Sequence, residues 1–110
     1  MGATATQIIG RILSENPKKT ISDTSLTTAG VMLLLYLKDG EYCILLNKRT
    51  DEVEHHKGEI SFPGGRMDEE DKTALDTALR ETHEEMGIRV EDVEYLGEID
   101  DFRTNSGFLV

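Results

Sequence analysis

Residues 80–88 read Arg80-Glu81-Thr82-His83-Glu84-Glu85-Met86-Gly87-Ile88. A turn signal, Phe62-Pro63-Gly64-Gly65, precedes them in the chain. In an α-helix, positions i, i+3 and i+4 lie on one face, so Glu81, Glu84 and Glu85 are predicted to converge on one point. Three like charges repel one another unless a cation lies among them. Carboxylate oxygens suit a hard divalent ion such as Mg²⁺ or Mn²⁺, which keeps waters and shares substrate phosphates. The spacing therefore predicts metal-assisted phosphate chemistry, with a solvated acidic helix face as the alternative.

The composition limits the size of the fold and the classes of partner. The chain has 110 residues and a formal net charge of −10. This length fits one compact domain and is too short for two ordinary ones. The acidic balance disfavours nucleic acid and anionic membranes, because both attract basic patches. It also makes a bare phosphate substrate unfavourable without a bridging cation, in agreement with the carboxylate cluster.

No segment of the sequence is predicted to be a membrane span or a secretion signal. The longest apolar run, residues 31–37, is too short to span a bilayer, and the N-terminus lacks the regions of a secretory signal. The single cysteine, Cys43, has no internal disulfide partner and is predicted to be a buried strand residue. We therefore expect a cytoplasmic protein.

Hydrophobic periodicity predicts two helices. Residues 6–13 carry apolar side chains at helical spacing, and Asn16-Pro17 stops this pattern. A second helix is predicted to end at Gly87, and the acidic residues 68–71 are expected at its N-terminal end, where the helix dipole favours them. One face of this helix is formed by Leu75, Ala78, Leu79, Thr82 and Met86. The three glutamates lie largely off that face and are free for chemistry.

Apolar runs between turn signals predict several strands. Residues 29–37 and 42–48 flank Asp39-Gly40, a strong hairpin signal because glycine accepts the positive φ of a tight turn. Residues 60–62 are predicted to form a brief strand that Pro63-Gly64-Gly65 ends. Further strands are predicted from the apolar alternation at residues 93–102 and 108–110. Together these elements predict an α/β or α+β fold with a mixed sheet flanked by helices.

The helix and its preceding glycine resemble the Nudix hydrolase signature: a glycine, a spacer with an acidic residue, then Arg-Glu-apolar-x-Glu-Glu-x-Gly-apolar. The matching positions are Arg80, Glu81, Glu84, Glu85, Gly87 and Ile88. Three positions depart from the general pattern. Thr82 stands where an aliphatic residue is usual, Gly65 lies one residue further from the arginine, and Asp71 replaces the spacer glutamate.

A second stretch is similar to the upstream signature of the coenzyme A pyrophosphatase subfamily, in which the additional spacer residue is normal. It comprises Leu45-Leu46-Asn47-Lys48-Arg49-Thr50, then Gly58, then Phe62-Pro63-Gly64-Gly65. Asn47 stands at a usual threonine position and Glu54 at a usual arginine position. The charge reversal at Glu54 matters more than the change at Asn47, because an arginine at that position would contact substrate phosphate and a glutamate would not.

The resemblance covers residues 29–110 and implies the α/β/α Nudix sandwich with a mixed sheet. Residues 1–110 are then expected to form a single Nudix-like domain, with an N-terminal helix within residues 1–17 and the core in residues 29–110. Nudix domains usually continue through further strands and a closing helix. The sandwich is therefore expected to be truncated at the C-terminus.

The resemblance implies that Glu81, Glu84 and Glu85 bind Mg²⁺ or Mn²⁺, with the Gly65 carbonyl as a further ligand. Such a metal neutralises a diphosphate, polarises a phosphorus–oxygen bond and helps to generate hydroxide. Arg80 is expected to orient the catalytic carboxylates, unless it forms an ordinary surface helix pair. One glutamate serves as general base, and the sequence does not choose which.

Substrate binding is assigned to Arg49, Gly64 and Gly65. The alternatives are a solvent-exposed arginine at a strand end and a plain turn. The expected substrate is a nucleoside diphosphate linked to another group, with coenzyme A or a derivative first, and ADP-ribose or a nucleoside triphosphate as alternatives. A non-catalytic nucleotide-binding module is the remaining hypothesis. An exposed half-strand at residues 108–110 would favour pairing with a second copy, so a homodimer is also considered.

Overall fold

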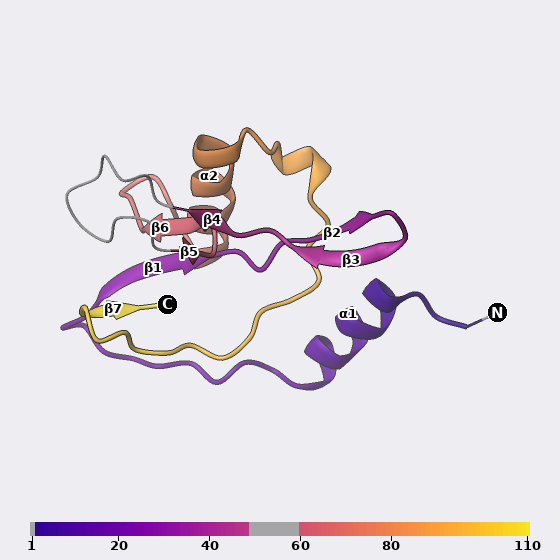
Figure 1. The fold of residues 1–110 in the computed structure, drawn as a ribbon. Helices are drawn as coiled ribbons and strands as arrows, with labels where there is room; N and C mark the ends of the chain where they lie inside the picture. Colours follow the sequence, from indigo (N-terminus) through magenta and orange to yellow (C-terminus); the bar gives the residue numbers. More distant parts are fainter. Residues whose placement is uncertain (1, 49–59) are drawn as a thin grey trace.

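The computed structural model describes residues 2–48 and 60–110, and its elements alternate between short strands and helices (Figure 1). In chain order these are α1 (Ala5–Glu15), β1 (Thr27–Val31), β2 (Leu35–Lys38), β3 (Glu41–Ile44), β4 (Asn47–Lys48), β5 (Ile60–Ser61), β6 (Gly64–Arg66), α2 (Ala74–Met86), the 3₁₀ helix η1 (Val90–Asp92) and β7 (Phe108–Leu109). This mixture of helix and strand confirms the predicted α+β fold class.

The central sheet is mixed, as predicted, with the strand order β6-β1-β7. Strand β1 is antiparallel to β6 and parallel to β7. Helix α2 packs against β1 and β6. The buried apolar side chains of the described residues, Ala29, Met32 and Ala78, lie in this layer. The small core therefore lies directly beneath the helix that carries the glutamates.

Helix α2 is capped at both ends. Thr73 and Asp76 form a reciprocal capping box at its start, and Gly87 ends it in the left-handed conformation at φ 71°. The predicted end is confirmed. The start is later than the acidic run implied, because residues 68–71 precede the helix and are not its first turn. The buried residues of α2 are Thr77, Ala78 and Thr82.

Gly30 of β1 allows the helix to approach the sheet closely. A Cβ atom at this position would overlap the carbonyl oxygen of Ala74 and lie 3.1 Å from the backbone nitrogen of Ala78. Both of these atoms belong to backbone near the start of α2, which cannot swing aside as a side chain can. The separation of α2 from β1 therefore depends on the absence of a side chain at Gly30.

The hairpin prediction is confirmed, whereas the run at residues 29–37 proves to be two strands. Asp39 and Gly40 connect β2 to β3 with φ values of 52° and 80°, as a two-residue hairpin turn with two positive φ angles requires. Residues 32–34 separate β1 from β2. The chain therefore leaves the central sheet before it forms the hairpin.

Two strand predictions in the second half of the chain need correction. Gly64 and Gly65 do not form a plain turn, because they belong to β6 and pair with Val31 and Gly30. Residues 93–102 form no strand despite their alternation. The predicted strand after residue 108 is confirmed as β7.

The ends of the described chain are held by pairing and by ion pairs. Phe102 and Val110 exchange two backbone hydrogen bonds of 3.0 and 2.9 Å, so β7 is paired on the side away from β1 as well. Lys18 Nζ lies 2.9 Å from Glu98 and 3.3 Å from Asp101. These contacts hold residues 98–102 beside the chain that leaves α1 (Figure 1).

Helix α1 confirms the first predicted helix, with a capping box between Thr4 and Gln7 and a C-cap at Asn16. It lies beside residues 96–97, where Leu13 packs closely around Gly97. Neither α1 nor α2 is long and apolar enough to cross a membrane, and this holds for every helix of residues 2–48 and 60–110.

Candidate metal-binding site on helix α2

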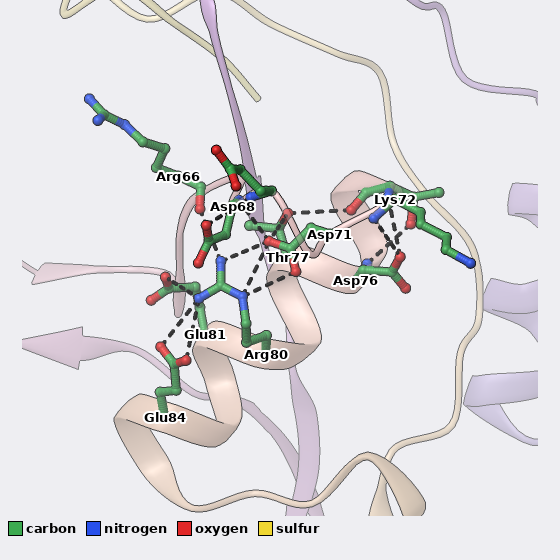
Figure 2. A network of polar contacts seen from close by, with 11 residues as sticks. Arg66, Asp68, Asp71, Lys72, Asp76, Thr77, Arg80, Glu81 and Glu84 are labelled. Atoms are coloured by element: carbon green, nitrogen blue, oxygen red, sulfur yellow. Dashed lines mark hydrogen bonds and ion pairs between the residues drawn. The ribbon is translucent and has the colours of Figure 1, made fainter.

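Arg80 lies at the centre of the polar network on α2 (Figure 2). Its Nε and Nη2 atoms donate to the carboxylate of Asp71, with a shortest distance of 2.8 Å. Nη2 also donates to the carbonyl oxygen of Arg66 at 3.1 Å, and Nη1 donates to Glu81 at 3.0 Å. The guanidinium thus joins α2 to β6 and to the turn between them.

Asp71 fixes this guanidinium in one orientation. Its carboxylate also accepts hydrogen bonds from the Asp68 backbone N–H at 2.9 Å and the buried Thr77 hydroxyl at 3.0 Å, and its side chain is only 5% exposed. Arg80 holds the pKa of Asp71 well below its ordinary value, and Asp71 in turn raises the pKa of Arg80. We call Asp71, Thr77 and Arg80 the arginine anchor.

Glu84 leans toward Arg80, from which it accepts weak hydrogen bonds of 3.3 and 3.4 Å (Figure 2). Its side chain is 56% exposed. Glu81 is more enclosed, because a Cβ atom at Gly65 would lie only 2.7 Å from the Glu81 carboxylate carbon. The absence of a side chain at Gly65 therefore makes room for the Glu81 carboxylate.

Glu85 lies on the side of α2 that faces β4. The Asn47 amide donates to its Oε2 at 2.8 Å. Partial burial of the carboxyl raises the pKa of Glu85, although the residue as a whole is exposed, and the negative charge of Glu81 raises the pKa further, while the Asn47 amide and the Gly64 backbone N–H oppose the rise. We call Glu81, Glu85, Asn47 and Gly64 the carboxylate corner.

The register of β6 shows which backbone groups face this corner. The Met32 N–H donates to the Pro63 carbonyl, and the Met67 N–H donates to the Thr28 carbonyl. Because hydrogen-bonded pairs alternate in an antiparallel ladder, Gly65 also turns its N–H and C=O toward β1. Gly64 falls between these pairs and turns its backbone groups to the outer edge of the sheet. Its N–H accordingly points to the side on which Glu85 lies, and it favours the ionised form and so lowers the pKa of that carboxyl.

The structure brings together part of the predicted site. Glu81, Glu85 and the Gly64–Gly65 backbone meet at the carboxylate corner, whereas Glu84 is paired with Arg80. Within residues 2–48 and 60–110, no three His, Cys, Asp or Glu side chains are arranged to hold a metal ion. Arg49 lies outside the described residues, so its predicted role stays a prediction.

The oxygen donors of the corner fit a hard divalent cation. Two carboxylates, Glu81 and Glu85, lie close enough for the charge of one to raise the pKa of the other. A cation beside them would relieve that repulsion, and all the donors are oxygens, which Mg²⁺ and Mn²⁺ prefer. Mg²⁺ keeps several waters and needs few protein ligands. These residues therefore fit the predicted metal, with Glu84 free to join if its side chain leaves Arg80.

Sequence reasoning missed three residues that the structure places at the site. Asn47 was noted only as a departure from a motif, and Thr77 was not singled out. Asp71 lies nine positions before Arg80, and no helical spacing links the two because a turn separates them. Its acidic character in the spacer was a usable signal, since the buried partner of an arginine is usually a carboxylate.

The sequence is similar to those of known proteins of one family. The chain matches the NUDIX domain family over residues 26–109. It is 42% identical over 87 residues to Nudix hydrolase 3 of Caenorhabditis elegans, a match that covers 78% of this chain and 35% of the relative. It is 32% identical over 109 residues to a protein of Yersinia enterocolitica named uncharacterized Nudix hydrolase NudL, covering 99% of this chain and 55% of that protein.

A similar protein of Photorhabdus laumondii, also named uncharacterized Nudix hydrolase NudL, is 36% identical over 94 residues, covering 86% of this chain and 49% of the relative. The α+β layer with its glutamate-bearing helix is thus that of a Nudix domain. The chain belongs to the Nudix family. It spans between about a third and about half the length of these relatives.

Proposed function

We propose that this Nudix domain binds Mg²⁺ or Mn²⁺ and hydrolyses a diphosphate bond in a nucleoside diphosphate linked to another group. The observation that carries the proposal is the carboxylate corner, where α2 presents Glu81 and Glu85 to the Gly64–Gly65 backbone beside an anchored arginine. Family membership supports the same reaction class, because two relatives bear the name Nudix hydrolase over segments that include this helix.

Glu81 and Glu85 would hold the cation, and Glu84 would complete the set. Of the two glycine carbonyls, we favour Gly64 as the backbone ligand in place of Gly65, because the β6 register turns Gly64 to the outer edge. When bound, the metal neutralises the diphosphate and lowers the pKa of a bound water. The role of general base falls to Glu84 or Glu85, since Glu81 is enclosed by Gly65 and Arg80.

Arg80 acts on the site through the carboxylates. Its pairing with Asp71 uses the donors that face the turn, and its remaining donors fix Glu81 and hold Glu84 (Figure 2). A planar guanidinium that is itself fixed by a bidentate carboxylate defines the direction of every other bond that it makes. We therefore assign to Arg80 a positioning role, which agrees with its expected function of orienting the glutamates.

Coenzyme A or a derivative is the leading substrate within this proposal, because the stretch from Leu45 to Gly65 is similar to the signature of coenzyme A pyrophosphatases. Asn47 of that stretch donates to Glu85, so the motif adjoins the metal helix. ADP-ribose and nucleoside triphosphates remain the alternative substrates. Cytoplasmic location and a homodimer remain predictions, and size-exclusion chromatography with light scattering tests the second.

Product analysis with purified protein tests the proposal. The chain is incubated with Mg²⁺ or Mn²⁺ and, separately, coenzyme A, ADP-ribose and a nucleoside triphosphate, and the products are separated chromatographically. For coenzyme A the expected products are adenosine 3′,5′-bisphosphate and 4′-phosphopantetheine, formed only with metal. An absence of metal-dependent turnover across the panel would refute the enzymatic proposal, and nucleotide binding without turnover would support the non-catalytic module instead.

A further inference from the structure

The hydrogen bond from Asn47 to Glu85 joins two parts of the molecule that are far apart in sequence. Asn47 begins β4, which pairs with β5 through Asn47–Ser61 and Lys48–Ile60. Glu85 lies 38 positions later, in the last turn of α2. Among the side-chain hydrogen bonds of the described residues, this one connects the β4–β5 ladder to the helix that carries the glutamates.

The chemistry of the two groups fixes the direction of the bond. An ionised glutamate can only accept hydrogen bonds, so the part of the Asn47 side chain that faces it must be the NH₂ group. The distance from Nδ2 to Oε2 is 2.8 Å, which is short for an N–H···O bond and is typical of a charged acceptor. A hydrogen bond of this kind favours the ionised carboxylate and opposes the effect of burial and of Glu81.

The position of the bond restricts the orientation of Glu85. Glu81 lies one helical turn before Glu85 on the same side of α2, and the two carboxylates repel each other. Without a partner on the β4 side, Glu85 would turn outward into water, away from Glu81 and from Gly64. Asn47 supplies a donor on that side. This donor holds Glu85 in the orientation in which it and Glu81 can share one cation.

We infer that Asn47 is a positioning residue, which holds the Glu85 carboxylate toward Glu81 and thereby raises the affinity of the carboxylate corner for a divalent metal. The inference rests on the proposed function and assigns a role to a residue of the upstream motif that does not itself bind metal. Asn47 also links the strand before the predicted substrate residue Arg49 to the metal helix.

The test compares two variants of almost equal shape, Asn47→Thr and Asn47→Val. Both are β-branched and suit a strand, but only threonine carries a hydroxyl that can donate to Glu85. Mn²⁺ binding is measured without substrate, by the electron paramagnetic resonance signal of free Mn²⁺. Asn47→Val is expected to weaken the affinity about tenfold, the lower end of the range for partners of metal ligands. Asn47→Thr is expected to retain most of the wild-type affinity.

Two controls show whether the effect passes through Glu85. Asn105→Val changes an exposed asparagine in the turn before β7 and is expected to bind Mn²⁺ as the wild type does. In a Glu85→Ala background, the difference between Asn47→Thr and Asn47→Val is expected to vanish, because the acceptor is gone. Equal Mn²⁺ affinities of the two Asn47 variants would overturn the inference, as would a difference that persists without Glu85.

The experiments also distinguish an error in the proposed function from an error in the role of Asn47. If the wild-type protein neither binds Mn²⁺ nor turns over any substrate of the panel, the proposed function is wrong. The contact is then tested in metal-free protein by a double-mutant cycle on unfolding, with Asn47→Val, Glu85→Ala and the double variant. Additive effects on the folding equilibrium would overturn the orientation of Glu85 by Asn47, and non-additive effects would support that orientation, although the part of the inference that concerns metal affinity falls with the proposed function.

Discussion

The arginine anchor and the carboxylate corner lie on the same helix and differ in how their charges are compensated. In the anchor, Asp71 meets a guanidinium, a hydroxyl and a backbone N–H, and its pKa falls. In the corner, Glu85 is partly desolvated beside a second carboxylate, and its pKa rises although the Asn47 amide donates to it. The anchor is electrostatically complete within the protein, whereas in the corner Glu81 shares the Arg80 guanidinium with Asp71 and Glu84, and Glu85 forms no ion pair among the described residues. The difference suggests a division of roles, in which the anchor stabilises the fold and the corner is the proposed metal site.

The largest expected effect on activity comes from a substitution in the carboxylate corner. Glu85→Gln keeps the shape of the side chain but removes the charge that would bind metal, so we expect kcat/KM to fall by about 100-fold or more. The thermal midpoint Tm without metal should not fall, because the change removes repulsion from Glu81. The matched control is Glu94→Gln, at an exposed position outside the site. A variant with wild-type activity would show that the corner is not the metal site.

A substitution in the arginine anchor should lower both stability and activity. Asp71→Asn leaves Arg80 without its carboxylate partner, so Tm should fall, and the loosened guanidinium should lower kcat/KM by about tenfold through misplaced glutamates. Asp39→Asn serves as control, since asparagine also accepts the positive φ at this turn position. If Tm is unchanged in Asp71→Asn while activity is lost, the anchor belongs to the catalytic site and the contrast between the anchor and the corner is wrong.

Gly65→Ala tests Glu81, which belongs to the carboxylate corner and contacts Arg80 of the arginine anchor. The new methyl group would press on the Glu81 carboxylate, which can move because it is the far end of a flexible side chain. We therefore expect Mn²⁺ affinity to fall about three- to tenfold, with little change in Tm. The control is Gly10→Ala in α1, where the nearest atom lies 3.9 Å from the added Cβ, and the free energy of unfolding should rise by about 0.5–1 kcal/mol. A large fall in Tm for Gly65→Ala would contradict this account.

The smallest expected effect is a change with pH in the stabilisation that Asp71 provides. The pKa of Asp71 is lowered in the folded protein, so its stabilising contribution is fully present above its unfolded value near 3.8 and is lost as pH falls toward the folded value. The difference in Tm between the wild type and Asp71→Asn should therefore be constant near neutral pH and should shrink below about pH 4. Thermal unfolding of both proteins from pH 7 to pH 3 measures it. A difference that grows in acid would contradict the assigned cause.

Local patterns predicted the parts of this molecule that depend on local chemistry. The period of α2, its end at Gly87 and the Asp39-Gly40 turn were all readable, because caps and tight turns involve residues a few positions apart. The Gly64–Gly65 strand was not readable, since glycine has no side-chain alternation and the strand exists only through its pairing with β1. Residues 93–102 show the reverse case, in which alternation is present but only the last residue, Phe102, pairs with the chain beside β7.

The residues of the candidate site also fall into those that the sequence predicts and those that it does not. Glu81, Glu84 and Glu85 followed from helical spacing and a family resemblance, and the expected set was only partly gathered because Arg80 draws Glu84 away. The partners from outside the helix, Asp71 and Asn47, could not be paired with it from sequence alone. Each reaches α2 across a turn or from another strand, where spacing along the chain carries no information about distance.

The close approach at Gly30 has a consequence for natural variation and for screening. This residue is not itself a predicted ligand, and its backbone angles would accept alanine, but any Cβ there meets the backbone at the start of α2. A substitution at this position would move the whole helix away from the sheet, and the glutamates with it. In a survey of inactive variants, Gly30 would therefore be recorded among the active-site positions although it supplies no side chain to the site.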